Sequence, residues 1–301
     1  MLSFTVTEAD AGTRVDRFAE KCRPDLSRAA IGKGIRTKRI KRNGKRTEGN
    51  ERLSAGDVLS IYLADAAPTE ISAKPVHVVY EDAQILIVQK EAGILCQDLA
   101  HPEADTLETR VAAQQKTAGP PPCFLCHRLD FHTSGLVLFA KDEKTLSLLE
   151  TAIREHRIVK RYLAVALGAV TPHEATLSHQ LFKDAKKGRV YLSNVPVKGS
   201  KTAILHYRVL DVRSGLSLVE CELVTGRTHQ IRAQMAAAGF PLLGDAKYGR
   251  KQDSRVYKES HQLLCAYQMT FETDPAGPLG YLAGKTVTLS DVPFRRKYFP
   301  K

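Results

Sequence analysis

The segment His127-Arg-Leu-Asp-Phe-His-Thr-Ser-Gly135 is polar, and an apolar run from Leu136 to Ala140 follows it directly. A short apolar run after a Ser-Gly pair is typical of a buried strand that begins at a turn. We therefore expect a loop that carries Asp130 at the start of a core strand. An aspartate before Thr-Ser-Gly often accepts hydrogen bonds from the amides of the turn, so a structural role for Asp130 is the alternative to a chemical one.

A second polar segment, Thr225-Gly-Arg-Thr-His-Gln-Ile-Arg232, follows a strand-like stretch in which Val219 and Cys221 alternate with glutamates. We expect Thr228 to cap a helix that ends at Gly239. The start of a helix suits anions because its first backbone amides are unpaired. The alternative is a capped helix whose polar side chains face solvent.

Short helices and strands alternate over the chain after residue 75. The sequence predicts strands near 76–79, 85–88, 136–140 and 162–167, and helices from Asp105 or Thr106 to Gln115 and from Glu143 to Glu155. This mixture, with strands that are mostly antiparallel, indicates an α+β domain.

The charge of the chain is unevenly distributed. Lysine and arginine number 45 against 33 acidic residues, which gives a net charge of +12. Residues 14–52 hold 14 of the basic side chains and 5 of the acidic ones, so nine of the twelve excess charges lie there. A concentrated positive patch attracts a polyanion, and nucleic acid is the commonest one in the cytosol. Nucleic acid is therefore the expected partner.

The basic segment also has the pattern of a small folded module. Val15, Phe18 and Ala19 recur at the spacing of one helical face, and Ser27 is suited to cap a second helix. An Asn-Gly pair at 43–44 predicts a hairpin turn between short strands. A solvated basic arm is the alternative, but the apolar pattern favours a folded unit.

Three parts are predicted along the chain: a module over residues 1–63, a linker over 64–74 and a larger domain over 75–301. Residues 64–74 show no hydrophobic period, and they end at Pro75. The expected fold class is α+β, with a small basic α/β module in front of the larger domain.

The sequence predicts neither a membrane segment nor an export signal. No apolar run approaches the roughly 20 residues that span a bilayer, and the first ten residues lack a signal-peptide pattern. We expect a cytoplasmic protein whose six cysteines are free thiols. Cys123-Phe-Leu-Cys126-His127 matches a haem-attachment pattern, but covalent haem is normally attached outside the cytosol, and a zinc site would need further ligands. The sequence therefore predicts no metal and no cofactor.

Taken together, H-R-L-D-x-x-T-S-G-L at 127–136 and T-G-R-T-H-Q-I-R at 225–232 resemble the motifs of RluA-type RNA pseudouridine synthases. The similarity extends to residues 79–90, 159–162 and 239–245. Enzymes of this family isomerise uridine to pseudouridine at specific positions in structured RNA, ribosomal or transfer RNA, by flipping the base and without a cofactor. The resemblance implies a catalytic domain with a mixed, mainly antiparallel sheet. It also implies an S-four-like N-terminal module, as in a small-subunit ribosomal protein.

The resemblance also assigns catalytic roles. Asp130 would be the catalytic aspartate, which attacks the anomeric carbon of the ribose or takes a ribose proton. Tyr162 would lie against the uracil and help to remove the proton from its carbon five. Arg232 would pair with Asp130 and keep its carboxylate ionised and in place.

Further residues are expected to contact the RNA. Arg128 would enter the space left by the flipped uridine, and Ile231 would pack below the base. The other candidates for substrate binding are Thr133, Arg227, His229 and Gln230. The candidates for phosphate contacts in the basic module are Arg28, Lys33, Arg36, Lys38, Arg39, Lys41, Arg42 and Lys45.

Two positions depart from the family pattern. Glu91 follows Lys90 where the family usually has proline, and we expect this change to affect stability without loss of activity. Gln234 stands where histidine is usual, one helical turn after Gln230, and its change is expected to touch substrate contacts.

A non-catalytic RNA-binding protein with the same fold is the rival interpretation. The intact residues Asp130, Tyr162 and Arg232 disfavour it. The sequence leaves open which RNA and which uridine are modified, and nothing in it requires more than a monomer.

Overall fold

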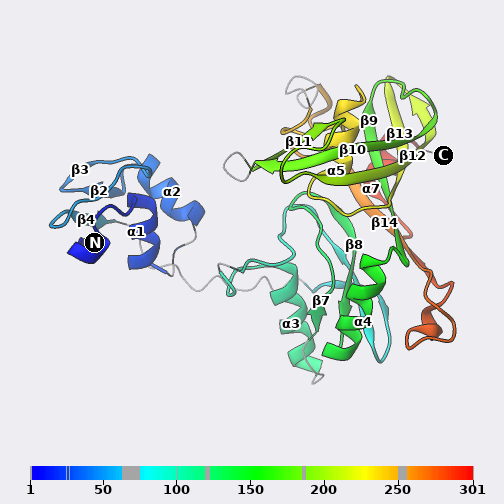
Figure 1. The fold of residues 1–301 in the computed structure, drawn as a ribbon, viewed down its shortest axis with the longest axis horizontal. Coiled ribbons are helices and arrows are strands. Elements are labelled where there is room, and N and C mark those ends of the chain that lie inside the picture. Colours follow the sequence, from blue (N-terminus) through cyan, green and yellow to red (C-terminus); the bar gives the residue numbers. More distant parts are fainter. Residues whose placement is uncertain are drawn as a thin grey trace. The chain divides into compact units, whose positions relative to one another are not determined.

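The computed structural model describes residues 2–24, 26, 28–62, 75–99, 101–118, 123–184, 188–249 and 256–300. The chain forms two compact units, and each is described by itself (Figure 1). The linker predicted over 64–74 and the predicted cap Ser27 lie outside the described residues. No helix in the described part of the chain is long and apolar enough to cross a membrane.

The N-terminal unit is a small sheet covered by two helices. Its elements are β1 (Leu2–Thr5), a 3-10 turn η1 (Glu8–Asp10), α1 (Val15–Cys22), α2 (Arg28–Arg36), β2 (Ile40–Arg42), β3 (Lys45–Arg46) and β4 (Val58–Ile61). The strand order is β1-β4-β2-β3. The predicted helical face of Val15, Phe18 and Ala19 is buried in the core of this unit. Asn43 and Gly44 both have positive φ angles, as the predicted hairpin turn requires.

The C-terminal unit contains the remaining elements. Its strands are β5 (His77–Glu81), β6 (Ile85–Lys90), β7 (Phe124–Leu125), β8 (Ser134–Ala140), β9 (Ile158–Leu167), β10 (Glu174–Asp184), β11 (Arg189–Ser193), β12 (Lys201–Arg213), β13 (Leu216–Leu223), β14 (Leu264–Phe271) and β15 (Thr286–Thr288). Its helices are α3 (Leu107–Ala118), α4 (Glu143–Arg154), α5 (Gln230–Ala237) and α7 (Pro293–Tyr298), with a 3-10 turn η2 (Gly280–Leu282).

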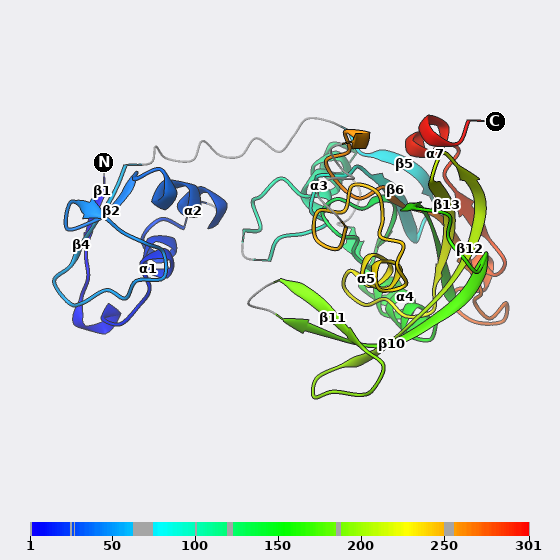
Figure 2. The same ribbon diagram turned by 90° about the horizontal axis from the view of Figure 1, so that it is seen from above.

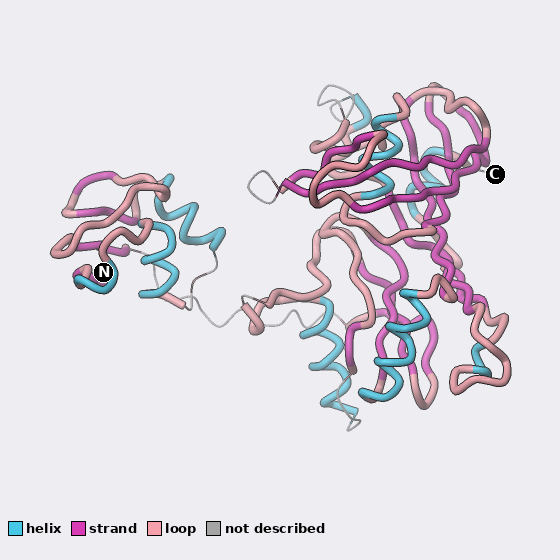
Figure 3. The backbone as a smooth tube through the Cα atoms, in the orientation of Figure 1, coloured by secondary structure: helices cyan, strands magenta, loops and turns pink. Residues whose placement is uncertain are grey.

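These strands form one sheet, drawn in magenta in Figure 3. The main path runs β11-β10-β12-β13-β9-β14-β8-β6-β5, with β15 paired to β14 and β7 paired to β8. The contact between β14 and β8 is parallel, and the other pairs of this sheet are antiparallel. The sheet is therefore mixed and mainly antiparallel, which confirms the expected fold class.

Strand β8 is buried on both faces, which explains its uninterrupted apolar sequence. Leu138 packs in the same cluster as Leu149 of α4, whereas its neighbour Phe139 packs with Val111 of α3. Because side chains alternate along a strand, one helix covers each face. The loop that carries Asp130 therefore enters a strand held rigidly from both sides.

Strand β9 divides its side chains between two clusters in the same way. Leu163 belongs to the cluster on the α4 side, while Tyr162 and Ala164 pack with Ile231 and Met235 of α5. Helix α5 also lies against β10, β11 and β12, and Figure 2 shows β10 and β12 curving past it. Tyr162 and the start of α5 are brought together by this packing.

Helix α3 differs slightly from its prediction. Of the two predicted caps, Thr106 is the one used, because its Oγ1 accepts a hydrogen bond from the backbone N–H of Thr109 at 3.2 Å. Asp105 instead forms an ion pair with Arg110 at 2.6 Å. The helix continues to Ala118, beyond the predicted end at Gln115.

Candidate active site

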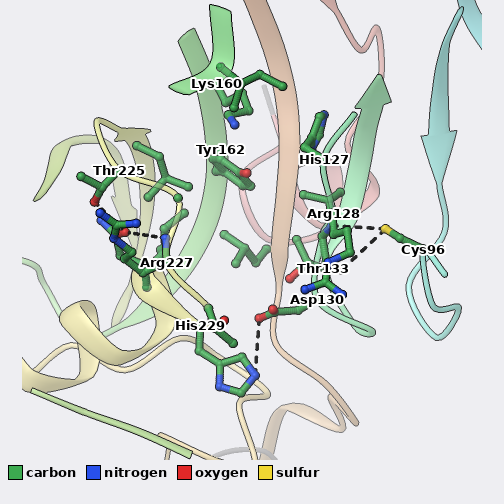
Figure 4. A pocket seen from close by; sticks show the side chains of 18 of the residues that line it. Cys96, His127, Arg128, Asp130, Thr133, Lys160, Tyr162, Thr225, Arg227 and His229 are labelled. Atoms are coloured by element: carbon green, nitrogen blue, oxygen red, sulfur yellow. Dashed lines mark hydrogen bonds and ion pairs between the residues drawn. The ribbon is translucent and has the colours of Figure 1, made fainter. Parts of the chain in front are cut away.

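A cleft of about 600 Å³ opens between the Asp130 loop, β9 and the start of α5. This volume lies in the range of ordinary small-molecule pockets. The predicted site residues that line it are Arg128, Asp130, Thr133, Tyr162, Arg227, His229, Gln230, Ile231 and Arg232. The structure thus brings together two polar segments that lie almost a hundred residues apart in the sequence (Figure 4).

The carboxylate of Asp130 faces the cleft and is bound by Arg232. Arg232 Nη1 donates to Asp130 Oδ2 at 3.0 Å, which is the pairing that the family resemblance implies. The turn after Asp130 is closed by its backbone carbonyl, which accepts from the N–H of Thr133 at 3.0 Å. Among the described residues no turn amide donates a hydrogen bond to the Asp130 carboxylate, so the carboxylate does not tie down this turn.

Arg232 also binds a second carboxylate, which sequence reasoning missed. Its Nε and Nη2 donate to the two oxygens of Asp245 at 2.7 and 3.0 Å. Asp245 Oδ1 additionally accepts from the backbone N–H groups of Lys247 and Tyr248. Burial disfavours the charge of Asp245, but Arg232 and these amides outweigh it, so the pKa of Asp245 is lowered. The available signal was the Gly-Asp pair at 244–245, at the end of the stretch 239–245 that resembles the family.

Tyr162 forms the wall of the cleft on β9. It is paired with Cys221 on β13 and with Ala266 on β14, and its ring packs in the same cluster as Ile231. Burial raises the pKa of Tyr162, and the negative charge of Asp130 raises it further. The hydroxyl is therefore a neutral phenol at physiological pH.

Gly135 permits the close approach that places Asp130 near Tyr162. The parallel contact between β8 and β14 puts Gly135 beside Ala266, and the φ angle of Gly135 is +119°. A Cβ at this position would lie 2.2 Å from the carbonyl oxygen of Ala266. A side chain would therefore push the two strands apart, so glycine is required by both space and backbone conformation.

The start of α5 differs from the prediction. The capping residue is His229, which has a left-handed backbone conformation and makes no side-chain capping bond. Thr228 is exposed, so the prediction that it caps the helix is wrong. The loop is instead closed by Gln230, whose Oε1 accepts from Thr225 Oγ1 at 2.8 Å and from the N–H of Arg227 at 3.0 Å. Hydrogen bonds of the Gln230 side chain within the loop thus replace the expected cap.

Gln230 and the other polar residues of α5 are buried, which contradicts a helix with solvated polar groups. The Nε2 of Gln230 donates to the carbonyl of Ile204 at 2.9 Å, so its amide is engaged by the loop and by β12. Gln234 is also fully buried, and its Nε2 donates to the carbonyls of Leu177 and Ala203. Gln234 does not line the cleft, so the expectation that it touches substrate contacts is wrong.

His229 stands between Asp130 and a tyrosine. Its Nε2 lies 4.0 Å from Asp130 Oδ2, and its Nδ1 is 2.9 Å from the hydroxyl of Tyr248. Burial lowers the pKa of His229 in spite of the nearby Asp130. The imidazole is therefore mainly neutral near pH 7, and Arg232 supplies the positive charge beside Asp130.

Two anchors that sequence reasoning missed hold the Asp130 loop. The ammonium group of Lys90 is completely buried and donates to the carbonyl of Phe131 at 3.0 Å. On the other side of Asp130, the thiol of Cys96 accepts from the N–H of Leu129 at 3.2 Å. Both contacts span more than thirty residues of sequence, which is why no local pattern indicated them.

The Cys-x-x-Cys-His segment has a structural explanation. The Nε2 of His127 accepts a hydrogen bond from the N–H of Leu138 at 3.2 Å, and burial lowers the pKa of His127 to about 3. The six cysteines are free. Among the described residues, no group of three or more His, Cys, Asp or Glu side chains is arranged to hold a metal ion.

The predicted basic patch of the N-terminal unit is mostly solvent-accessible. Its exposed members are Arg28, Lys33, Arg36, Lys38, Arg39 and Lys45, while Lys41 and Arg42 are half-buried. Arg28 is paired with Glu20 at 2.7 Å and Arg42 with Asp57 at 2.6 Å. The charges of these two arginines are therefore partly neutralised within the unit.

Comparison with known proteins identifies the family. The family model described as RNA pseudouridylate synthase matches residues 84–237. The ribosomal large subunit pseudouridine synthase D of Yersinia pestis is 32% identical over 255 residues, covering 82% of this chain and 76% of that protein. The chain belongs to the RNA pseudouridine synthases. It is an isomerase that converts uridine to pseudouridine in RNA.

Other sequence relatives and solved structures of pseudouridine synthases are also similar to this chain. The protein named uncharacterized RNA pseudouridine synthase YlyB of Bacillus subtilis is 28% identical over 257 residues, covering 83% of this chain and 84% of that protein. The solved structure of human RNA pseudouridylate synthase domain containing 4 has a TM-score of 0.59 at 20% identity, covering 72% of this chain and 89% of that one. The structural likeness shows the fold, and the matched segment contains Asp130, Tyr162 and Arg232.

Proposed function

We propose that this pseudouridine synthase uses Asp130 as its catalytic carboxylate. The observation that supports this role is the pair of Asp130 and Arg232 in the cleft, where Oδ2 is bound by the guanidinium. Among the described residues, Oδ1 has no hydrogen-bond partner and is available to a substrate. An ionised carboxylate beside an electron-poor sugar carbon can attack it or take a neighbouring ribose proton.

The reaction is an isomerisation, so the nucleotide keeps its atomic composition and no second substrate is needed. The bond between N1 of uracil and C1′ of ribose breaks, the base rotates, and a bond from C5 to C1′ forms. The hydrogen on C5 is lost to solvent, and N1 gains one. Arg232 remains a cation, because a guanidinium does not give up its proton at physiological pH, and its hydrogen bond holds the Asp130 carboxylate in place before the reaction.

Tyr162 is proposed to support the uracil ring as a neutral phenol. Its raised pKa excludes a phenolate formed before the substrate binds. Its ring and Ile231 form an apolar wall of the cleft, which suits the face of a planar base. Arg128 is exposed at the cleft next to Asp130, so it is placed to fill the stack that the flipped uridine leaves.

Large-subunit ribosomal RNA is the proposed substrate, since relatives at about 31–32% identity are named for modification of that subunit. Residues 1–63 are proposed to act as an S-four-like RNA-binding module, joined by the linker over 64–74 to a catalytic domain over 75–301. The accessible basic side chains of the module suit RNA phosphates, which give a salt-dependent grip without choosing a base. We further propose that the enzyme acts in the cytoplasm as a monomer.

Pseudouridine mapping in cells tests the substrate and the role of Asp130 together. A strain that lacks the protein is complemented with the wild type or with Asp130→Asn. We expect sites in ribosomal RNA that vanish on deletion, return with the wild type and stay absent with the variant. Sites that appear in transfer RNA instead would correct the substrate. If no site changes, the chain binds RNA without modifying it, or another synthase covers the same uridines.

A further inference from the structure

Lys160 lines the catalytic cleft, and the mechanism above gives it no role. It lies two residues before Tyr162 on β9, so the two side chains share one face of the strand. Both line the cleft, and in the view of Figure 4 Tyr162 lies between Lys160 and Asp130. The strand rise places Lys160 about 7 Å beyond Tyr162 along the cleft.

The ammonium group of Lys160 has no counter-charge. Among the described residues no carboxylate, carbonyl or hydroxyl forms a hydrogen bond or ion pair with it. Two other half-buried lysines do have such partners: Lys141 binds Glu81 at 2.6 Å, and Lys247 donates to the carbonyl of Gly188 at 2.7 Å. Burial lowers the pKa of Lys160, and no nearby acid raises it again. Burying an unpaired cation is unfavourable, so an anion bound beside Lys160 would stabilise its charged form.

The rest of the cleft favours the same kind of ligand. Arg128, Arg154 and Arg227 also line it. Asp130 is the single acid among the described lining residues, and it is bound by Arg232, which it shares with the buried Asp245. A carbonyl oxygen of a base carries only a partial charge, whereas each nucleotide of RNA carries a full negative charge on its phosphate. A phosphodiester therefore matches the charge of this end of the cleft.

We propose that Lys160 binds a phosphodiester group next to the target uridine and so fixes the register of the flipped nucleotide against Tyr162 and Asp130. This inference rests on the proposed function, because it takes the uridine to react at Asp130. Lys160 is a binding and positioning residue in this account, with no part in the bond changes at the ribose. Its charge is what acts, so arginine is expected to replace it and a neutral side chain of similar length is not.

The test compares Lys160→Met, Lys160→Arg and Lys144→Met in the full-length enzyme. Lys144 is exposed at the first turn of α4, away from the residues that line the cleft, so its variant controls for loss of one positive charge. With a short RNA that contains a mapped target uridine, Lys160→Met is expected to raise KM about tenfold with little change in kcat. Lys160→Arg should restore most of the loss, and Lys144→Met should behave as the wild type.

A neutral linkage in the RNA identifies the phosphate. Replacing one phosphodiester next to the target uridine by a methylphosphonate should weaken binding to the wild type about tenfold and leave binding to Lys160→Met almost unchanged. The methylphosphonate is placed on one side of the target uridine and then on the other. The inference is wrong if, at both places, the losses of affinity from Lys160→Met and from the neutral linkage add up as independent effects. It is also wrong if Lys160→Met has the same KM as Lys144→Met.

The RNA-binding measurements are repeated with the Lys160 substitutions combined with Asp130→Asn, so that they do not depend on turnover. If the wild-type enzyme forms no pseudouridine, the proposed function is refuted. The comparison of binding affinities would still decide the role of Lys160. Circular dichroism of each variant verifies that the fold is kept. If Lys160→Met fails to fold, Lys160→Arg and the wild type are compared for binding to the phosphodiester RNA and to the methylphosphonate RNA. The inference is supported if the neutral linkage weakens binding to both proteins equally. It is overturned if the linkage changes binding to neither protein.

Discussion

Arg232 joins a reactive carboxylate to a structural one. Asp130 is 24% exposed at its side chain and faces the cleft, whereas the side chain of Asp245 is completely buried. The guanidinium makes two hydrogen bonds with the buried partner and one with the exposed partner. Asp245 thus fixes the geometry of Arg232, and Arg232 fixes that of Asp130.

The two aspartates should therefore respond differently to the same substitution. Asp245→Asn leaves a buried guanidinium without its counter-charge, so we expect the free energy of unfolding to fall by about 3 kcal/mol. Turnover should fall as well, because Arg232 loses its orientation. Asp130→Asn should abolish turnover with a much smaller loss of stability. Urea unfolding followed by circular dichroism measures this difference, and equal losses for both variants would contradict the division of roles.

Lys90 gives a prediction for pH. Burial lowers the pKa of Lys90 to about 8 from its ordinary value of 10.5. Below pH 8 the ammonium is charged in both the folded and the unfolded chain, and the folded state bears the full cost of burying it. Between pH 8 and 10.5 the unfolded chain binds more protons than the folded one, so this contribution to the free energy of unfolding rises with pH.

The measurement is the difference in free energy of unfolding between the wild type and Lys90→Met, taken from pH 7 to 10.5. Subtracting the variant removes the contributions of other titrating groups. The free energy of unfolding of the wild type, minus that of Lys90→Met, should be constant below pH 8 and should increase above it. A difference that falls over the same interval would mean that Lys90 is stabilised as a cation by the carbonyls of Glu91 and Phe131, to which its ammonium group donates.

At the scale of elements, the contact of β8 with β14 decides where the catalytic loop lies. Gly135→Ala would place a Cβ against the backbone of Ala266 and impose an unfavourable φ angle. We expect a loss of about 3 kcal/mol in stability and a loss of turnover out of proportion to the folded fraction, because the Asp130 loop is displaced. Gly93→Ala is the matched control, since Gly93 has a φ angle of +89° but open space around it. Equal effects of both variants would show that backbone strain, and not the close approach, matters.

Strong local patterns predicted several elements in both units. The apolar run of β8, the spacing in α1 and the Asn-Gly turn all encode their structure in a few neighbouring residues. Strands β10, β11 and β12 were not predicted, and much of β10 and β12 is exposed. The pairing of Asp130 with Arg232 followed from the family resemblance. The predicted cap at Thr228 was wrong because the Gln230 side chain closes the loop by accepting hydrogen bonds from Thr225 and Arg227, while its Nε2 is held by Ile204, 26 residues away.

The anchors of the site were beyond prediction from local sequence. Lys90 and Cys96 reach the Asp130 loop only after β6 and β8 have paired. Asp245 reaches Arg232 through a turn that local periodicity does not encode. Such contacts arise from the tertiary fold, so a residue pattern alone gives no sign of them.

At the scale of the whole molecule, binding and chemistry are assigned to different units. The exposed basic side chains of the N-terminal unit should supply affinity, and the cleft of the C-terminal unit should supply turnover. Replacing Lys33, Arg36, Lys38, Arg39 and Lys45 together by glutamine should weaken RNA binding and reduce the slope of log K against log salt by about 0.7 to 0.9 for each phosphate that the variant no longer neutralises. The paired residues Arg28 and Arg42 are left intact to keep the unit folded.

With saturating RNA, the same variant should keep most of its turnover. Binding across a salt series and single-turnover kinetics measure the two effects separately. An unchanged salt slope would refute the RNA-binding role of this unit. A loss of turnover at saturation would show that the N-terminal unit also places the uridine in the cleft.

Release of the C5 hydrogen of uridine shows whether Asp130 performs the chemistry. Enzyme in excess is mixed with ribosomal RNA carrying tritium at C5 of uridine, and tritium in the solvent is followed over one turnover. The account predicts release by the wild type, and none above background by Asp130→Asn at RNA concentrations at which the variant binds equally well. Release by Asp130→Asn at the wild-type rate would contradict the account and return Asp130 to a structural role.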